Sequence, residues 1–535
     1  MSAFITILLL AAIGVPLFVI VGMVTGVSFM AYTDVVNDFY GLKELIKPFE
    51  DLLGRIPFLA IPLFIASGAV MTSGGLAQRL VGIFRAAFGW VPGGMAVAAI
   101  MSCVMFAAIS GSSPVTLIAV GSIMFPAMVE ARYPENFSLG VIMTAGSLGC
   151  LVPPALSILI YTIAVAGRSA RVDPGDMFLA AAVPAGIIAL FLVLYSVWVG
   201  RRIPGPRPTF SWAELWYSIK DGVWALLLPV IVLGGIYTGF YSPYQAGSIA
   251  LVYSLVVTMF IYRELDLKKV ILVLADAGKL MGMLILIIVL AFGLNAFLAE
   301  IRVEQKLLHL LESWNLGPVG FMLLVNVVLI LLGALMDSVS ATLIFAPILA
   351  PIAVSHYGMD PLHFGVVFIV NMEIGYLAPP VATNLFVAAA VFKKPFGQVC
   401  RAVMPTLGVT CAALVLFMYV PTCSTGLVSV KKGEKVWKSF PWGGLSAEER
   451  QGVGRESIEK ATDKAADEAK KGPDQNTMSE EDYYAPKAPK KGKKSKPEDG
   501  ASKPKGAGSK PSQVDKPKPA PTPKGSDDDP DDPPL

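Results

Sequence analysis

A nine-residue segment, Gly149 to Ser157, recurs in the second half of the chain as Gly375 to Thr383. Each copy has a Gly-x-Leu-x-Pro-Pro core inside a long apolar run. Proline lacks the backbone N–H group and clashes with the preceding helical turn, so both Pro-Pro pairs must interrupt a helix and free its carbonyl groups. Matching broken helices in two halves of a membrane protein indicate a transport site where the halves meet.

The composition predicts a membrane protein. The chain has 535 residues, of which 54% are hydrophobic and only 16% are charged. Many apolar runs are about twenty residues long, which is enough for a helix to cross a bilayer of roughly 30 Å. We therefore predict an all-α polytopic membrane protein embedded in the lipid bilayer. The net charge of +3 is too small to indicate a nucleic-acid partner.

Catalytic motifs are absent from the sequence. The five cysteines and three histidines have no metal-ligand spacing, and the cysteines are interpreted as small buried hydrophobes. There is no Gly-x-Ser-x-Gly elbow, no His-Glu-x-x-His and no Walker loop. We predict that the protein is not an enzyme, has no organic cofactor, and is driven by an ion gradient.

An internal repeat organises the chain. In each half the order is a span, an amphipathic interfacial helix, an interrupted hairpin and a broken span. Basic residues near span ends favour the cytoplasm, and counting spans from Arg201 and Arg202 makes the two hairpins enter from opposite sides. This predicts an inverted repeat with two re-entrant hairpins and two broken helices. Four pairs of identical residues share one separation of 226 positions: Pro92 and Pro318, Gly94 and Gly320, Ser112 and Ser338, and Gly149 and Gly375.

The repeat divides the chain into five predicted segments. The last is rich in Lys, Pro, Asp, Glu and Gly, and cannot bury enough apolar surface to offset its ordering entropy, so we expect it to be disordered. The segments are an N-terminal span and connector (1–55), repeat 1 (56–200), scaffold spans (201–269), repeat 2 (270–424) and the charged tail (425–535).

Interrupted helices at mid-depth present free carbonyls and helix ends that can hold an ion. We expect Na⁺, a hard cation, to be held by backbone carbonyls of the hairpins and broken helices, with side-chain oxygens from each half completing one site. The alternative is that the hydroxyl groups only pack between helices or bond to their own backbone. The ion- or substrate-binding candidates are Ser110, Gly111, Ser112, Ser113, Thr116, Gly149, Pro153, Pro154 and Ser157 in repeat 1, and Asp337, Ser338, Ser340, Thr342, Glu373, Gly375, Pro379, Pro380, Thr383 and Asn384 in repeat 2.

Two of these candidates are ionisable. Placing such a group within a membrane segment costs about 2.5–3.5 kcal/mol on insertion scales, so each needs a partner or a role. We expect Asp337, in the second hairpin, to be functional. Glu373 stands two residues before the break at Gly375, and both a functional role and a bracing role remain open.

The motifs together resemble those of the large, DctM-like membrane subunit of tripartite ATP-independent periplasmic (TRAP) transporters. The resemblance covers roughly residues 3–424. Besides the two Gly-x-Leu-x-Pro-Pro segments, it is carried by Leu59–Phe64, Ser73–Gly75, Ile109–Pro114 and Gly234–Pro243.

The resemblance implies a multi-pass protein of the bacterial inner membrane that imports small organic anions with Na⁺ by an elevator mechanism, as in other ion transporters of this superfamily. It also implies two protein partners, a periplasmic substrate-binding protein and a small four-span membrane subunit. The sequence departs from the family pattern at Ala155, Ala378 and Ala382, and at Tyr244-Gln245. Two side-chain oxygens near the predicted ion sites are therefore missing, which shifts ion coordination toward backbone carbonyls.

Two other functions remain open from the sequence. One is a stand-alone anion/Na⁺ symporter of the same superfamily that needs no binding protein. The other is a membrane scaffold or sensor whose charged tail recruits partners.

Overall fold

The computed structural model describes residues 19–20, 22–23, 25–26, 56–166, 172–203, 208–379 and 382–437. These residues form helices joined by short loops, and no strand occurs among them. Within these described ranges, eight helices are long and apolar enough to cross a membrane, or nine if one bent helix pair is a single span. The predicted all-α polytopic fold is confirmed. The connector before residue 56, Pro380 and the chain after residue 437 lie outside the described residues.

From residue 56 on, the first half forms helices in the predicted order, with interruptions at the predicted positions. A tight glycine turn, with Gly75 at φ +65°, bends the amphipathic helix by 70° from the apolar helix before it. A second interruption, at Gly111 and Ser112, separates the two arms of the first hairpin. In order, the elements are η1 (Ile56–Leu59), α4 (Ala60–Ser73), α5 (Leu76–Phe88), α6 (Gly94–Ser110), α7 (Ser113–Glu130), α8 (Glu135–Ser147), η2 (Leu148–Cys150), α9 (Leu156–Val165) and α10 (Pro174–Gly200).

The second half repeats this order. The starts of the five helices from α14 to α18 lie 226 residues after those of α5 to α9, to within two residues in each case. The second-half elements are α11 (Trp212–Thr238), α12 (Pro243–Val256), η3 (Val257–Ile261), α13 (Leu267–Glu300), α14 (Val303–Ser313), α15 (Pro318–Leu335), α16 (Ser338–Pro351), η4 (Ile352–His356), α17 (Pro361–Leu377), α18 (Thr383–Phe392), α19 (Phe396–Met418) and α20 (Thr422–Lys432).

The two halves interlock. Within each half the first hairpin arm packs on the helix before the break, α6 on α8 and α15 on α17. Across the halves, α9 packs on α16 and α18 packs on α7. Each short helix after a Pro-Pro pair therefore lies against the hairpin of the other half. Re-entry of the hairpins and an inverted orientation stay predictions.

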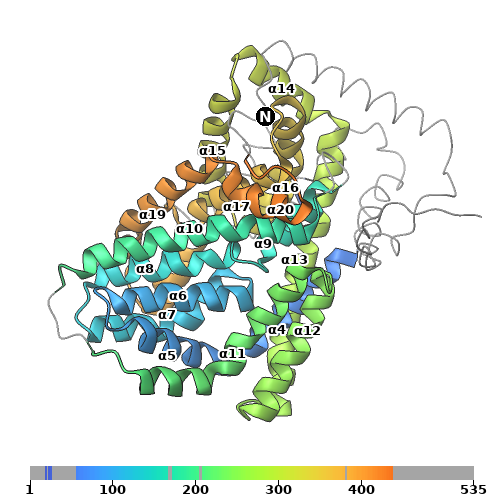
Figure 1. Ribbon diagram of the computed structural model, residues 1–535. Helices are drawn as coiled ribbons and strands as arrows, with labels where there is room; N and C mark the ends of the chain where they lie inside the picture. Colours follow the sequence, from blue (N-terminus) through green and yellow to red (C-terminus); the bar gives the residue numbers. More distant parts are fainter. Residues whose placement is uncertain are drawn as a thin grey trace, which may run out of the picture. The chain divides into compact units, whose positions relative to one another are not determined.

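A second group of helices flanks this interlocked body. Helix α4 packs against both α12 and α13, and Figure 1 shows α12 and α13 running beside it. The hydroxyl group of Thr25, in the N-terminal helix, donates to the carbonyl of Leu290 in α13 at 3.5 Å. The spans predicted as scaffold therefore contact the segments that lead into both hairpins.

The predicted start of the tail is wrong. Residues 425–432 belong to α20, in which Thr425, Val428 and Ser429 are buried. This helix packs on α10, where Lys432 Nζ lies 2.7 Å from an oxygen of Asp176. The segment escaped prediction because its apolar residues are sparse, and only the α10 surface shows that they have a partner.

Candidate functional site

The tip of the first hairpin is docked on the first Pro-Pro break. The carbonyl of Gly111 accepts a hydrogen bond from the backbone N–H of Leu156 at 3.1 Å. Gly111 has φ +58°, and a Cβ added to it would stand 2.5 Å from the carbonyl oxygen of Pro154. Only glycine meets both requirements, the left-handed backbone and the close approach. The break and the hairpin tip are thus one packed unit.

Hydroxyl groups at this tip bond to each other and to the backbone. Ser110 Oγ and Thr116 Oγ1 are 2.8 Å apart, and Thr116 also donates to the carbonyl of Ser112 at 2.8 Å. Both side chains are buried. Here the structure shows the contacts expected from the packing alternative.

The second hairpin is organised by a helix cap. Asp337 is the N-cap of α16, and its carboxylate accepts from the backbone N–H of Ser340 at 3.0 Å and from the hydroxyl of Ser340 at 2.7 Å. Thr342 donates to the carbonyl of Ser338 at 2.6 Å. A capping role therefore explains Asp337 at least in part.

The second break is tied to its hairpin as the first one is. The backbone N–H of Ala382 donates to the carbonyl of Ala334 at 2.9 Å, and Ala382 is the counterpart of Leu156 in the repeat. Of the remaining candidates in this break, Pro379 and Thr383 are exposed, and Pro380 lies outside the described residues. The same kind of backbone bond therefore closes both breaks.

Contacts across the halves differ from the predicted grouping. Asn384, predicted to act with the second hairpin, donates from Nδ2 to Ser113 Oγ of the first hairpin at 2.6 Å. Ser157, which was grouped with the first hairpin, reaches the thiol of Cys150, and this thiol lies 4.0 Å from Ser338 Oγ in the second hairpin. Periodicity along one chain could not reveal this exchange of α9 and α18 between the halves.

Sequence reasoning missed the residues that follow the break glycines. The sequence predicts only a small buried hydrophobe at Cys150, whereas the structure places its thiol beside both hairpins. Its counterpart in the repeat is Tyr376, which is also buried. Their position in the sequence could have identified them, since both residues come directly after the first glycine of the repeated motif.

A buried carboxylate joins the two broken helices. Glu373 is completely buried in α17, and its Oε1 accepts a hydrogen bond from Ser147 Oγ of α8 at 2.8 Å. Its other oxygen, Oε2, has no hydrogen-bond partner among the described residues. Ser147 was not among the predicted residues, although it stands 226 positions before Glu373.

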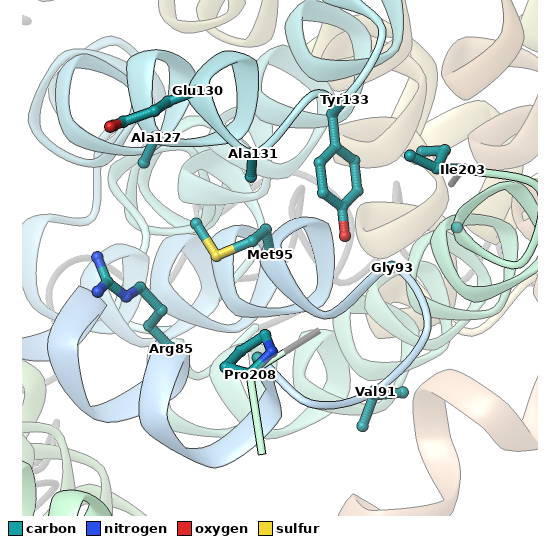
Figure 2. A pocket seen from close by; sticks show the side chains of 12 residues that line it. Arg85, Val91, Gly93, Met95, Ala127, Glu130, Ala131, Tyr133, Ile203 and Pro208 are labelled. Atoms are coloured by element: carbon teal, nitrogen blue, oxygen red, sulfur yellow. The ribbon is translucent and has the colours of Figure 1, made fainter. Parts of the chain in front are cut away.

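The pocket shown in Figure 2 lies away from these breaks. It has a volume of about 360 Å³ and is lined where α5, α7 and α10 end, by residues that include Arg85, Glu130 and Tyr133. None of its lining residues is a predicted ion ligand. The predicted binding segments are instead packed directly against one another.

One charged contact ties the ends of the broken helices. Lys394, just after α18, forms an ion pair with Glu135 at the start of α8. The hydrogen bond from Lys394 holds the pKa of Glu135 below its usual value. The Glu135 side chain is about one third exposed, so solvent weakens this pair.

Comparison with known proteins gives one consistent family. The family model described as "Tripartite ATP-independent periplasmic transporter, DctM component" matches residues 4–423. The chain is 36% identical over 456 residues to the C4-dicarboxylate TRAP transporter large permease protein DctM of Vibrio cholerae, covering 81% of this chain and 98% of that protein. It is 41% identical over 371 residues to the protein of the same name from Pseudomonas aeruginosa, covering 69% and 85% respectively.

Two further matches are a longer relative and a solved structure. The isethionate TRAP transporter permease protein DctMQ of Oleidesulfovibrio alaskensis is 33% identical over 415 residues, which cover 77% of this chain and 64% of that protein. The crystal structure of the Alcanivorax borkumensis YdaH transporter superposes with a TM-score of 0.54 at 15% identity, covering 81% of this chain and all of that one. The second match concerns the fold alone.

Proposed function

Because the chain belongs to the family of DctM components, the large permeases of TRAP transporters, we propose that it imports a small organic anion in symport with Na⁺. Family membership and the apolar helices make it a multi-pass protein of the inner membrane. The proposal adds the coupling ion, the substrate class, the partners and the mechanism.

One observation supports Na⁺ coupling most directly. In both halves a hairpin carbonyl accepts from the residue that ends the Pro-Pro break, Gly111 from Leu156 and Ala334 from Ala382. Non-helical backbone thus lies against a hairpin at each break, over residues 151–155 in the first and at Ala378, Pro379 and Ala382 in the described part of the second. Oxygen donors suit a hard cation, and broken helices provide such sites in transporters. We propose one Na⁺ at each break.

The names of the relatives support the substrate class. Permeases similar to this chain are named for C4-dicarboxylates, isethionate and 2,3-diketo-L-gulonate, all of which are small organic anions. Others are named for ectoine, a small zwitterion. We propose a small organic acid as the substrate of this chain.

The proposed partners are a periplasmic substrate-binding protein and a small four-span membrane subunit. The chain covers only 64% of the relative named DctMQ, which leaves part of that protein for a second component. Exposed apolar side chains on α11, including Trp212, Trp216 and Val230, offer a surface for lipid or for the small subunit.

We propose an elevator as the mechanism. The interlocked body of α6 to α9 and α15 to α18 would move as a unit against α4, α12 and α13. Its internal contacts support this, since each half contributes a helix that packs on the hairpin of the other half. A body joined in this way can shift without separating its hairpins from its breaks.

Reconstituted uptake tests the proposal. Proteoliposomes containing this chain and the small subunit are supplied with a binding protein loaded with radiolabelled organic acid, and uptake is measured with an inward Na⁺ gradient or an equal K⁺ gradient. We expect uptake only with Na⁺. Equal uptake in both salts would overturn Na⁺ coupling, and uptake by this chain alone would favour the stand-alone symporter.

A further inference from the structure

Ser147 and Glu373 are repeat counterparts that touch. They stand 226 positions apart, the separation that relates the two halves, and Ser147 Oγ lies 2.8 Å from Glu373 Oε1. When two units are related by rotation, a residue can contact its own counterpart only close to the rotation axis. The hydrogen bond therefore marks where the two halves meet, at the crossing of α8 and α17.

Each of these residues stands two positions before the first glycine of a break. Gly149 follows Ser147, and a Cβ added to Gly149 would lie 2.6 Å from the carbonyl oxygen of Ser112 in the first hairpin. Gly375 follows Glu373, and a Cβ added there would lie 2.7 Å from the α-carbon of Gly333 in α15, the first arm of the second hairpin. At both breaks the glycine thus lies directly against hairpin backbone, with no space for a side chain between them.

These contacts form one continuous chain. It runs from Ser112 through Gly149 and Ser147 to Glu373, and from there through Gly375 to Gly333. Its one side-chain link is the Ser147–Glu373 bond, and both residues are completely buried. A displacement of one hairpin on ion binding can pass to the other through this packed backbone and the Ser147–Glu373 hydrogen bond, beside the contacts of Asn384 with Ser113 and of Cys150 with Ser338.

We propose that the Ser147–Glu373 hydrogen bond couples the two cation sites, so that an ion bound at one break favours binding at the other. Both are positioning residues, acting through Gly149 and Gly375 rather than by contact with the ion. The inference rests on the proposed Na⁺ symport. Contiguous packing alone does not establish coupling between sites, so the test must measure cooperativity.

The experiment compares three variants in the reconstituted uptake system, with uptake measured as a function of Na⁺ concentration. Ser147→Ala removes the donor and Glu373→Leu removes the acceptor, whereas Glu373→Gln keeps an amide oxygen where Oε1 accepts. We expect wild type and Glu373→Gln to give a Hill coefficient above one. For Ser147→Ala and Glu373→Leu we expect a coefficient near one, with half-saturating Na⁺ raised roughly 5-fold or more.

A matched control separates coupling from stability. Thr144 and Thr406 form another buried hydrogen bond, 2.7 Å long, that joins α8 to α19 rather than to α17. Thr406→Val removes it, and we expect a lower melting temperature with unchanged Na⁺ cooperativity. Size-exclusion chromatography and melting temperature show which variants fold. If Glu373→Leu does not fold, the comparison of wild type with Ser147→Ala, the smaller change, still decides the outcome.

The outcomes distinguish the two proposals. If wild-type uptake requires Na⁺ but Ser147→Ala stays as cooperative as wild type, the coupling role is overturned and the symport stands. The coupling role also fails if Thr406→Val loses cooperativity to the same extent. If wild-type uptake ignores Na⁺, the proposed symport is overturned, and the coupling role with it.

Discussion

Single residues at the breaks are constrained by backbone as much as by side chains. Gly149 lies against the backbone of Ser112 and Ser113, and Gly111 lies against Pro154. Ala155, where the family resemblance suggests a hydroxyl, is completely buried and supplies no polar group. In the first break, carbonyl groups are therefore the abundant oxygen donors.

Gly149→Ala tests the close contact at the first break. The new methyl group meets Ser112 backbone, which cannot give way as a flexible side chain could, so we expect a loss of about 1–3 kcal/mol in stability and strongly reduced uptake. The melting temperature in detergent measures the first effect. Gly186→Ala in α10, where a Cβ meets nothing within 4 Å, should leave stability equal or slightly higher.

Asp337→Asn separates the capping role of this residue from its charge. Asparagine caps helices about as well as aspartate, so we expect an unchanged melting temperature. If the charge takes part in transport, uptake should fall by about tenfold or more, the equivalent of one charge-assisted hydrogen bond. Glu130→Gln, at the exposed end of α7, should keep wild-type uptake, and equal activity of the two variants would count against the hairpin as a site.

The stability that an ion pair contributes depends on how deeply the pair is buried. Asp176 in α10 is only 11% exposed and receives both Lys431 and Lys432 of α20, at 3.1 and 2.7 Å. Lys279 and Asp276 in α13 also approach to 2.7 Å, but both are over 70% exposed. Although the N···O distances are similar, we therefore expect the buried pair to contribute more to the stability of the folded protein than the exposed pair.

Asp176→Asn should release α20 from α10. We expect stability to fall by about 1–2 kcal/mol, between the values for exposed and for buried pairs, because both lysines are partly exposed. Asp276→Asn, the matched control, should change stability by less than about 0.5 kcal/mol. Thermal unfolding followed by fluorescence measures both, and equal effects would show that α20 is held by apolar packing alone.

The Glu135–Lys394 pair predicts an acid-dependent weakening of the contact between α8 and the end of α18. The pKa of Glu135 is lowered in the folded protein, so its contribution is present above the unfolded value of about 4.3 and is lost as pH falls through the folded value. Melting temperatures of wild type and Glu135→Gln should therefore differ at pH 7 and converge in acid. A constant difference down to about pH 3 would contradict this assignment.

At the scale of the whole molecule, the family match ends within two residues of the start of α20, at residue 423. The last described residue is Trp437, after the helix has ended. The relative from Vibrio cholerae is covered over 98% of its length. The charged segment beyond Trp437 is therefore additional to what these permeases share.

Deleting residues 438–535 tests whether that segment is needed. We expect the truncated protein to reach the membrane and to retain Na⁺-dependent uptake within about twofold of wild type, because every predicted site residue precedes the cut. A shorter protein that ends at residue 424, and so lacks most of α20, should be less stable. Complete loss of activity in a folded 1–437 protein would favour the scaffold or sensor function.

The order of the helices from α5 to α9 and from α14 to α18, and the positions of their interruptions, follow from the sequence alone. Gly-Ser-rich and Pro-Pro interruptions are local properties of the backbone, so the breaks at Gly111, Asp337 and Pro153-Pro154 could be located without a structure. The separation of 226 residues likewise needs only a comparison of the chain with itself. The whole helical order from α5 to α9 could therefore be predicted along with its counterpart.

Which of these elements contact one another could be learned only from the folded structure. Asn384 binds Ser113 rather than its own hairpin, Cys150 lies beside both hairpins, and Ser147 contacts Glu373. The burial of α20 on α10 was equally unpredictable from local composition. The physical reason is that the pairing of α9 with α16 and of α18 with α7 depends on how two halves pack, and residues hundreds of positions apart carry no local signal of such contacts.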